Sequence, residues 1–172
     1  MNIKMSKPIM CKILRNSRYK GIYTYKNFAY IFDAYRAVKF LPSMIDTSDT
    51  DVSVFEVNYF DMENKIKIID NLMNISDGNT YCISKSKLSE KVKGHKKVYL
   101  KLSNTYVNAR WLLDLLKLVN VKNIVVTVDT NDVKKPILIK HNDYSTSILM
   151  PVWHQGTDKT PIIEVEEVLK ED

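Results

Sequence analysis

From Lys97 to Trp153 the chain reads KVYLKLSNTYVNARWLLDLLKLVNVKNIVVTVDTNDVKKPILIKHNDYSTSILMPVW, and this stretch decides the fold. Apolar and polar residues alternate over 98–102, which predicts a strand. Residues 111–118 are rich in leucine, contain no Gly or Pro, and have the spacing of a helix with one apolar face. Asn104 or Thr105 can cap the first turn of that helix. The first half of the stretch therefore predicts a strand followed by a helix.

Three short strand patterns complete the stretch. They are rich in β-branched and aliphatic residues and lie at 123–128, 136–140 and 145–152. The polar connections between them are short, which favours an antiparallel meander. Asp129, Asp132 and Asp143 fall in these connections, where aspartate is expected to bond to the backbone of a turn rather than to act in catalysis.

Two further patterns lie upstream. Residues 21–40 are aromatic and β-branched and are interrupted at Lys26 and Asn27, which predicts a hairpin. Residues 59–74 place apolar side chains at nearly helical spacing without Gly or Pro, which predicts a helix. The chain thus combines strands and helices on both sides of its middle.

The middle of the chain has the weakest pattern. Turn-forming residues follow Pro42, and short strands are expected at 52–57 and 80–84. The lysine-rich segment from Ser84 to His95 receives no assignment. After Trp153 a polar stretch leads to residues 162–169, where apolar residues alternate with glutamate, so a strand or a short helix outside the main pattern is expected.

Composition limits the function classes. A length of 172 residues with 45% hydrophobic and 27% charged residues fits one globular domain. No run approaches the roughly 18 apolar residues of a membrane span, and no leader pattern opens the chain, so a cytoplasmic protein without a membrane partner is expected. The four glycines exclude a glycine-rich phosphate loop. Cys11 and Cys82 have no zinc-site spacing, so neither a metal nor another cofactor is expected.

Charge is distributed unevenly along the chain. Residues 1–45 carry nine Lys or Arg against one Asp, a local charge of 9 − 1 = +8, whereas residues 154–172 carry two against six, 2 − 6 = −4. A basic face attracts the phosphate backbone of nucleic acid without reading sequence. An ordinary solvated surface in a lysine-rich protein explains the same charges equally well.

A family resemblance joins two of these patches. The order strand, helix, meander over 97–153, ending in Leu149-Met150-Pro151-Val152, resembles the closing half of a domain of the bacterial sliding clamp, the beta subunit of DNA polymerase III. The segment Ile31 to Val38, IFDAYRAV, is similar to a strand end of the same family, with Ala34 and Tyr35 in place of the usual Gly and His. Both patches occur in the order that the family has.

The resemblance implies an α+β fold. It implies a single DNA-clamp-like domain, with an antiparallel sheet and two helices packed on one face. The expected boundaries are 1–153 for the domain, with a divergent insertion at about 46–96, and 154–172 for an acidic C-terminal tail. The family builds a ring of six such domains from two chains, and this chain has length for one. It is expected either to assemble as a homo-oligomer or to act as a stand-alone domain.

The resemblance also implies two sets of binding residues. The family passes DNA along basic helices, without sequence specificity, and the residues expected in this role are Arg15, Arg18, Lys20, Arg110 and Lys117. The family also captures short motifs of replication proteins in an apolar pocket. The residues expected there are Asp33, Tyr35, Arg36, Ala37, Leu149, Met150, Pro151 and Val152. A solvated helix face and a core-closing strand are the alternative interpretations of the two sets.

The expected function is therefore that of a clamp-like DNA replication accessory, a processivity or recruitment protein of a phage or mobile element. Catalysis is not expected, because His95, His141 and His154 have no carboxylate or cysteine at ligand spacing and no nucleophile motif is present. The alternative is an adaptor or inhibitor that mimics a clamp and binds replication proteins without encircling DNA. A basic nucleic-acid-binding protein unrelated to clamps is a third hypothesis.

Overall fold

The computed structural model describes residues 4–15, 17–18, 21–45, 54–56, 60–74 and 78–171. Of residues 54–56 and 60–61 it describes the backbone alone. The elements in chain order are α1 (Lys7–Arg15), β1 (Ile22–Tyr25), β2 (Phe28–Phe32), β3 (Arg36–Phe40), η1 (Pro42–Met44), β4 (Val54–Glu56), α2 (Phe60–Leu72), β5 (Asn79–Ser84), α3 (Lys85–Val92), β6 (Tyr99–Leu102), β7 (Thr105–Asn108), α4 (Ala109–Val119), β8 (Asn123–Val128), β9 (Ile137–Asn142), β10 (Ser145–Leu149), β11 (Ile162–Glu164) and η3 (Val165–Glu167).

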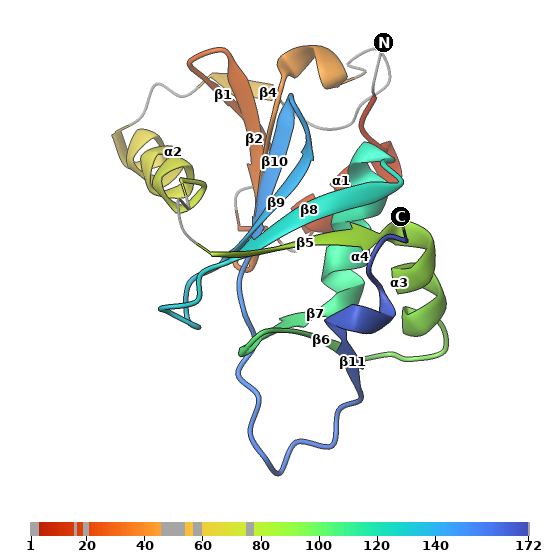
Figure 1. Cartoon of the computed structure of the whole chain (residues 1–172). Helices are drawn as coiled ribbons and strands as arrows, with labels where there is room; N and C mark the ends of the chain where they lie inside the picture. The colour runs from red at the N-terminus through yellow and green to blue at the C-terminus, as the bar shows by residue number, and fades with distance from the viewer. Residues whose placement is uncertain are drawn as a thin grey trace.

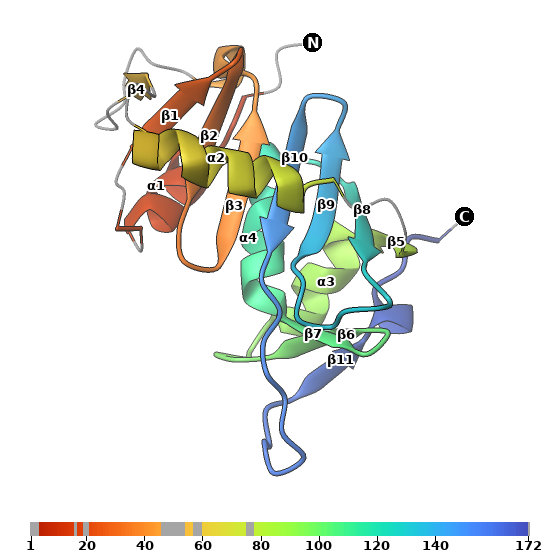
Figure 2. The ribbon, with the colours of Figure 1, turned by 90° about the vertical axis from the view of Figure 1, so that its left-hand side faces the viewer.

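An eight-stranded sheet runs through the molecule in the order β4-β1-β2-β3-β10-β9-β8-β5. Its strands pair antiparallel except for β4, which is parallel to β1. Helices α1, α3 and α4 cover one face, and α2 lies across the other (Figures 1 and 2). A smaller sheet, β11-β6-β7, lies at one end. The α+β fold class is confirmed, while helices cover both faces of the sheet rather than one.

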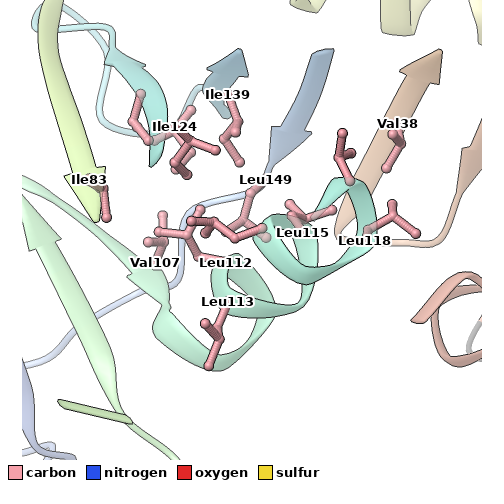
Figure 3. Close-up of a cluster of buried hydrophobic side chains, with 14 of the residues drawn as sticks. Val38, Ile83, Val107, Leu112, Leu113, Leu115, Leu118, Ile124, Ile139 and Leu149 are labelled. Atoms are coloured by element: carbon pink, nitrogen blue, oxygen red, sulfur yellow. The ribbon is translucent and has the colours of Figure 1, made fainter. Parts of the chain in front are cut away.

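The two faces bury separate cores because alternate residues of a strand point to opposite sides. In β2, Ala29 and Ile31 join the core beneath α1, α3 and α4, whereas Tyr30 and Phe32 join the core beneath α2. Helix α4 contributes seven buried side chains to the first core, with Leu112, Leu115 and Leu118 pointing at the sheet (Figure 3). The position of α4 is therefore fixed by an apolar face that leaves few side chains to solvent.

The hairpin expected at 21–40 is confirmed and extended. Strands β1 and β2 pair antiparallel, and both residues of the connecting turn have positive φ, 48° at Lys26 and 70° at Asn27. Two consecutive positive φ values belong to the tight turn that suits the twist of two paired strands. A third strand, β3, then pairs with β2. The helix at 59–74 is confirmed as α2, with Tyr59 outside the described residues.

The expected cap of the helix at 111–118 is wrong. A strand, β7, lies between Asn104 and the helix, because Thr105 and Val107 alternate inward and pair with β6. The helix begins at Ala109, and the N-cap is Asn108. Its side-chain oxygen accepts from the backbone N–H groups of Arg110 at 3.1 Å and Trp111 at 3.2 Å. The sequence pattern did not reveal the four-residue strand that directly precedes the helix.

The meander is confirmed as β8, β9 and β10, although its last strand ends at Leu149 rather than at Val152. The unassigned lysine-rich segment forms α3, which Ser84 caps and which buries Leu88 and Val92. The expected strand at 80–84 is β5, and the one at 52–57 is described only over 54–56, as β4. Residues 46–96 thus supply both edge strands of the main sheet.

The segment expected to be an acidic tail outside the main pattern is part of the folded unit. Strand β11 pairs parallel with β6, and Ile163, Val165 and Val168 are buried in the larger core. The alternation of apolar residues with glutamate is therefore an amphipathic pattern whose apolar side faces the protein. No helix among the residues that the structure describes is long and apolar enough to cross a membrane.

Candidate nucleic-acid and peptide interfaces

Helices α1 and α4 pack side by side, and each exposes basic side chains to solvent. In α1, Met10, Ile13 and Leu14 are buried, which leaves Arg15 exposed on the outer side of the helix. A salt bridge of 3.0 Å between Lys12 Nζ and Asp114 Oδ2 links α1 to α4. The two helices are therefore in direct contact through charged side chains.

Helix α4 contributes Arg110 and Lys117, which are exposed and seven residues apart, so they lie close to one side of the helix. The Arg110 guanidinium donates to the backbone carbonyl of His95, which draws the loop after α3 to this surface. Lys117 lies in the last turn, where a cation is favourable beside the partial negative charge of a helix C-terminus. Arg15, Arg110 and Lys117 define what we call the helix face.

The other two cations expected to contact DNA are not on the helix face. Arg18 follows α1 and lines a pocket beside Lys65 of α2. Lys20 lies outside the described residues. Of the five expected residues, the structure therefore groups Arg15, Arg110 and Lys117 on two packed helices.

A buried ion-pair network lies beneath the helix face. Arg36 Nε is 3.1 Å from Asp33 Oδ2, and Arg36 Nη1 is 3.4 Å from Asp114 Oδ2. The side chains of Arg36 and Asp33 are each 2% exposed and that of Asp114 is 8% exposed. Lys12 reaches Asp114 from solvent. The network joins the turn after β2 to both helices, and it leaves the Arg36 guanidinium inaccessible to a ligand.

The two halves of the expected peptide site lie on neighbouring strands. Arg36 is opposite Leu149 and Ala37 is opposite Ile148 in the pairing of β3 with β10. The Met150 N–H donates to the Tyr35 carbonyl at 2.8 Å. The Tyr35 ring is half exposed and lies 4.7 Å from the Trp111 ring, centroid to centroid. The fold therefore brings residues 33–37 and 149–150 together within a single domain.

The two halves nevertheless line different pockets. The first pocket, of about 430 Å³, lies between α2 and the end of β2 and is lined by Ser17, Arg18, Phe32, Asp33, Ala34, Lys65, Ile68 and Ile69. The second pocket, of about 260 Å³, lies beyond the end of β10 and is lined by Asn104, Thr105, Tyr106, Val133, Lys134, Met150, Pro151, Val152, Trp153 and His154. Tyr35, Arg36, Ala37 and Leu149 line neither pocket.

Sequence reasoning missed the residues of α2 that form the first pocket. Ile68 is 58% exposed in spite of its apolar side chain, whereas Ile69 and Phe32, which line the same pocket, are buried. The helical spacing predicted α2 but not the strand against which it packs. The consecutive isoleucines Ile68 and Ile69 are a weak sign of such a pocket. Only one of two consecutive helical residues can face the sheet fully, so the other is left partly exposed.

A serine and a histidine lie in hydrogen-bond contact in the interior. His141 Nε2 is 2.6 Å from Ser147 Oγ, a distance at which a histidine can activate a hydroxyl. Both residues are buried, however, and His141 Nδ1 has no hydrogen-bond partner to orient the ring. Burial also lowers the pKa of His141 from 6.5 to about 3. A substrate has no access to this pair, and it acts as a polar contact between β9 and β10.

No group of three or more His, Cys, Asp or Glu side chains among the described residues is placed to hold a metal ion. The clusters of carboxylates that do occur are paired with lysine or arginine, as in the network around Arg36. Asp129 and Asp132 accept from backbone N–H groups of their own turn, as the sequence predicted.

The fold is that of a DNA sliding-clamp domain. The solved structures that it resembles include DNA polymerase III beta chains and beta clamps from three bacteria. The match to the Streptococcus pneumoniae protein has a TM-score of 0.50 at 12% identity and covers 86% of this chain and 63% of that one. The match to the Helicobacter pylori clamp bound to a DNA ligase peptide has a TM-score of 0.51 at 12% identity and covers 88% of this chain and 64% of that one. The match to the Borrelia burgdorferi DNA polymerase III beta subunit in complex with a natural product has a TM-score of 0.52 at 9% identity and covers 86% of this chain and 60% of that one.

The TM-scores of 0.50 to 0.52, at identities of 9% to 12%, show a shared fold and no more. The chain spans less than two thirds of the length of each of the three clamps, 60% to 64%. No protein-family model matches the sequence. No curated protein matches it either.

Proposed function

We propose that this protein is a clamp-like accessory of DNA replication that holds duplex DNA against its helix face without reading sequence. The observation that carries the proposal is the exposure of Arg15, Arg110 and Lys117 on two packed helices of a sliding-clamp fold. Exposed cations on packed helices suit phosphates, because each contact releases condensed counterions and needs no base edge. The proposed protein is a binding module rather than an enzyme, since the Ser147–His141 pair is closed to solvent.

We expect Arg110→Glu/Lys117→Glu to weaken duplex binding at low salt equally for unrelated sequences. The slope of log affinity against log salt should fall in magnitude by about two, roughly one for each lost phosphate contact. Fluorescence anisotropy with two duplexes of different sequence, titrated at several salt concentrations, measures both quantities.

The matched control is Lys67→Glu/Lys140→Glu. These lysines are exposed on α2 and β9, and the double change alters the net charge by the same amount. The control should keep the affinity within a factor of about three, because exposed charges more than a Debye length from the contact are screened. Equal losses in the two variants, or no binding by the unaltered protein at low salt, would remove the proposal.

We also propose that the first pocket docks a short peptide segment of a replication protein. Its lining includes the apolar side chains of Phe32, Ile68 and Ile69 and the cations Arg18 and Lys65. An apolar side chain next to a carboxylate would complement this pocket. The H. pylori clamp, which shares the fold, was solved with a DNA ligase peptide.

Ile68→Asp is the variant that tests the pocket. It places a carboxylate in the apolar part of the lining, so we expect at least a tenfold weaker binding of a labelled peptide that pairs leucine or phenylalanine with aspartate, about 1.4 kcal/mol or more. Ile162→Asp is the control, since Ile162 is an exposed isoleucine on β11, away from the pocket. Equal affinities for both variants would exclude this pocket. Peptide binding without duplex binding would favour the adaptor that does not encircle DNA.

A further inference from the structure

The second pocket, beyond the end of β10, has an exposed tryptophan in its lining. Trp153 is 73% exposed, which makes it the most exposed of the large apolar side chains among the described residues. Val133, which is 43% exposed, lines the same pocket. Single apolar residues scattered over a surface need no explanation, but two around one hollow are a different case. The pocket therefore offers a ligand apolar surface that the fold itself does not cover.

Strand β7 holds one wall of this pocket in place. The Val152 N–H donates to the Tyr106 carbonyl at 2.8 Å, and the two residues form an antiparallel bridge. The chain that leaves β10 therefore runs beside β7, and Trp153 follows the bridge directly (Figure 2). A site that is formed before its ligand arrives loses little conformational entropy on binding.

Aromatic rings and lysines alternate around the second pocket. The ring of His154 stacks on that of Tyr106, with centroids 4.5 Å apart and planes inclined by 27°. Lys101 Nζ lies 5.9 Å from the centre of the Tyr106 ring, and the exposed Lys134 is part of the lining. Proteins that bind single-stranded nucleic acid use this combination, because bases stack on the rings while cations meet the phosphates.

We propose that the second pocket binds one unpaired base of a single-stranded nucleic acid. The base stacks on the Trp153 indole, and Lys134 meets a neighbouring phosphate. The volume of about 260 Å³ suits a single base, since pockets that enclose a drug-sized ligand measure roughly 300–1,000 Å³. The exposed amide of Asn104, also in the lining, can donate to or accept from the edge of the base.

The lining favours a base over the apolar side chain of a peptide. The first pocket is lined by Ile68 and Ile69, which have no flat face, whereas the second presents the aromatic rings of Tyr106, Trp153 and His154. Flat rings gain most from another flat ring stacked on them. A nucleotide also brings its own phosphate to the lysines, which an apolar side chain does not.

The base site goes beyond the proposed function and does not depend on it. The second pocket contains no residue of the helix face and none of the first pocket. Trp153→Ala should therefore leave duplex binding unchanged. A protein that fails to bind duplex on its helix face would still bind a single strand here.

The test uses the fluorescence of Trp153. The chain has two tryptophans, so Trp111→Phe leaves Trp153 as the only indole. The probes are a short oligodeoxyadenylate and an abasic oligomer of the same length. The two oligomers carry the same phosphates, but only the first has bases, so the comparison separates stacking from attraction between charges.

We expect the oligodeoxyadenylate to quench the emission of Trp153 to saturation and the abasic oligomer to leave it unchanged. Trp153→Ala should weaken the binding of labelled oligodeoxyadenylate by about fivefold or more, the lower end of what one base gains from an aromatic face. Trp153→Phe should restore most of the affinity. Tyr144→Ala is the matched control, because Tyr144 is 56% exposed and lies in the turn between β9 and β10, at the other end of β10.

Three results would overturn the base site. The first is equal quenching by the two oligomers, or quenching by neither at low salt. The second is an equal affinity of Trp153→Ala and Tyr144→Ala for the oligodeoxyadenylate. The third is quenching by the peptide that pairs leucine or phenylalanine with aspartate in place of the oligodeoxyadenylate, which would assign the second pocket to a peptide.

Discussion

Replacement of Arg36 by alanine is expected to lower the free energy of unfolding by about 3–5 kcal/mol. The guanidinium lies between the carboxylates of Asp33 and Asp114, and all three side chains are at most 8% exposed. Without Arg36 the carboxylates of Asp33 and Asp114 stay buried, where little water can solvate their negative charges. Their remaining cationic partner is Lys12, which reaches Asp114 from the surface. The cost of a buried charge without its counterion exceeds that of the lost contacts alone. Urea denaturation followed by circular dichroism measures it.

Lys12→Ala is the control for this prediction. Lys12 bonds to the same carboxylate, Asp114, but its side chain is 53% exposed. An exposed ion pair contributes about 0–1 kcal/mol, so the variant should remain within that range of the unaltered protein. A similar small loss for Arg36→Ala would mean that the network does not join the helices to the sheet as described.

Acid should destabilise the protein strongly through His141. Burial lowers the pKa of this histidine to about 3, from 6.5 in the unfolded chain. Between these two values the unfolded state binds one more proton than the folded state, so stability is complete above pH 6.5 and falls as the pH falls toward 3. The expected loss from this group alone is about 3 kcal/mol between pH 7 and pH 4.

Comparison with His141→Gln separates this effect from the titration of carboxylates. Glutamine cannot be protonated and keeps a polar group near Ser147, so the variant should lack the histidine part of the pH dependence. Denaturation curves at pH 7, 5.5 and 4 for both proteins give the difference. Parallel pH profiles would show that His141 is protonated in the folded protein and that the interior at β9 and β10 admits water.

The sequence predicted those helices and strands whose own residues carry a clear local pattern. The turn at Lys26 and Asn27 follows from two residues that tolerate positive φ between aromatic strands. The apolar residues at helical spacing predicted helix α4, and the short polar connections between strand patterns predicted the meander. Strand β7 was not predicted, because its four residues run directly into α4 and its pairing partner is set by the turn at Ser103, which has a φ of 55°.

The candidate sites could be predicted only in part, since each depends on contacts between distant residues. The spacing of Asp33 and Arg36 suggested a related pair, but their partner Asp114 is 78 residues from Arg36 and belongs to a helix whose rotation the sequence does not specify. The pocket beside Asp33 depends on Ile68 and Ile69, on a helix whose docking site is tertiary. The burial of Ile163, Val165 and Val168 likewise depends on contacts with distant residues, such as the pairing of β11 with β6, which the glutamates around these apolar positions did not reveal.

The central claim, that the helix face contacts duplex DNA, is tested most directly by photo-crosslinking from single positions. A benzophenone amino acid is placed at Lys117 on α4 in one variant and at Lys67 on α2, across the sheet, in another (Figure 2). We expect a crosslink to labelled duplex from position 117 that disappears as salt is raised, and only background from position 67. Equal crosslinking from both positions, or crosslinking from position 67 alone, would contradict the account.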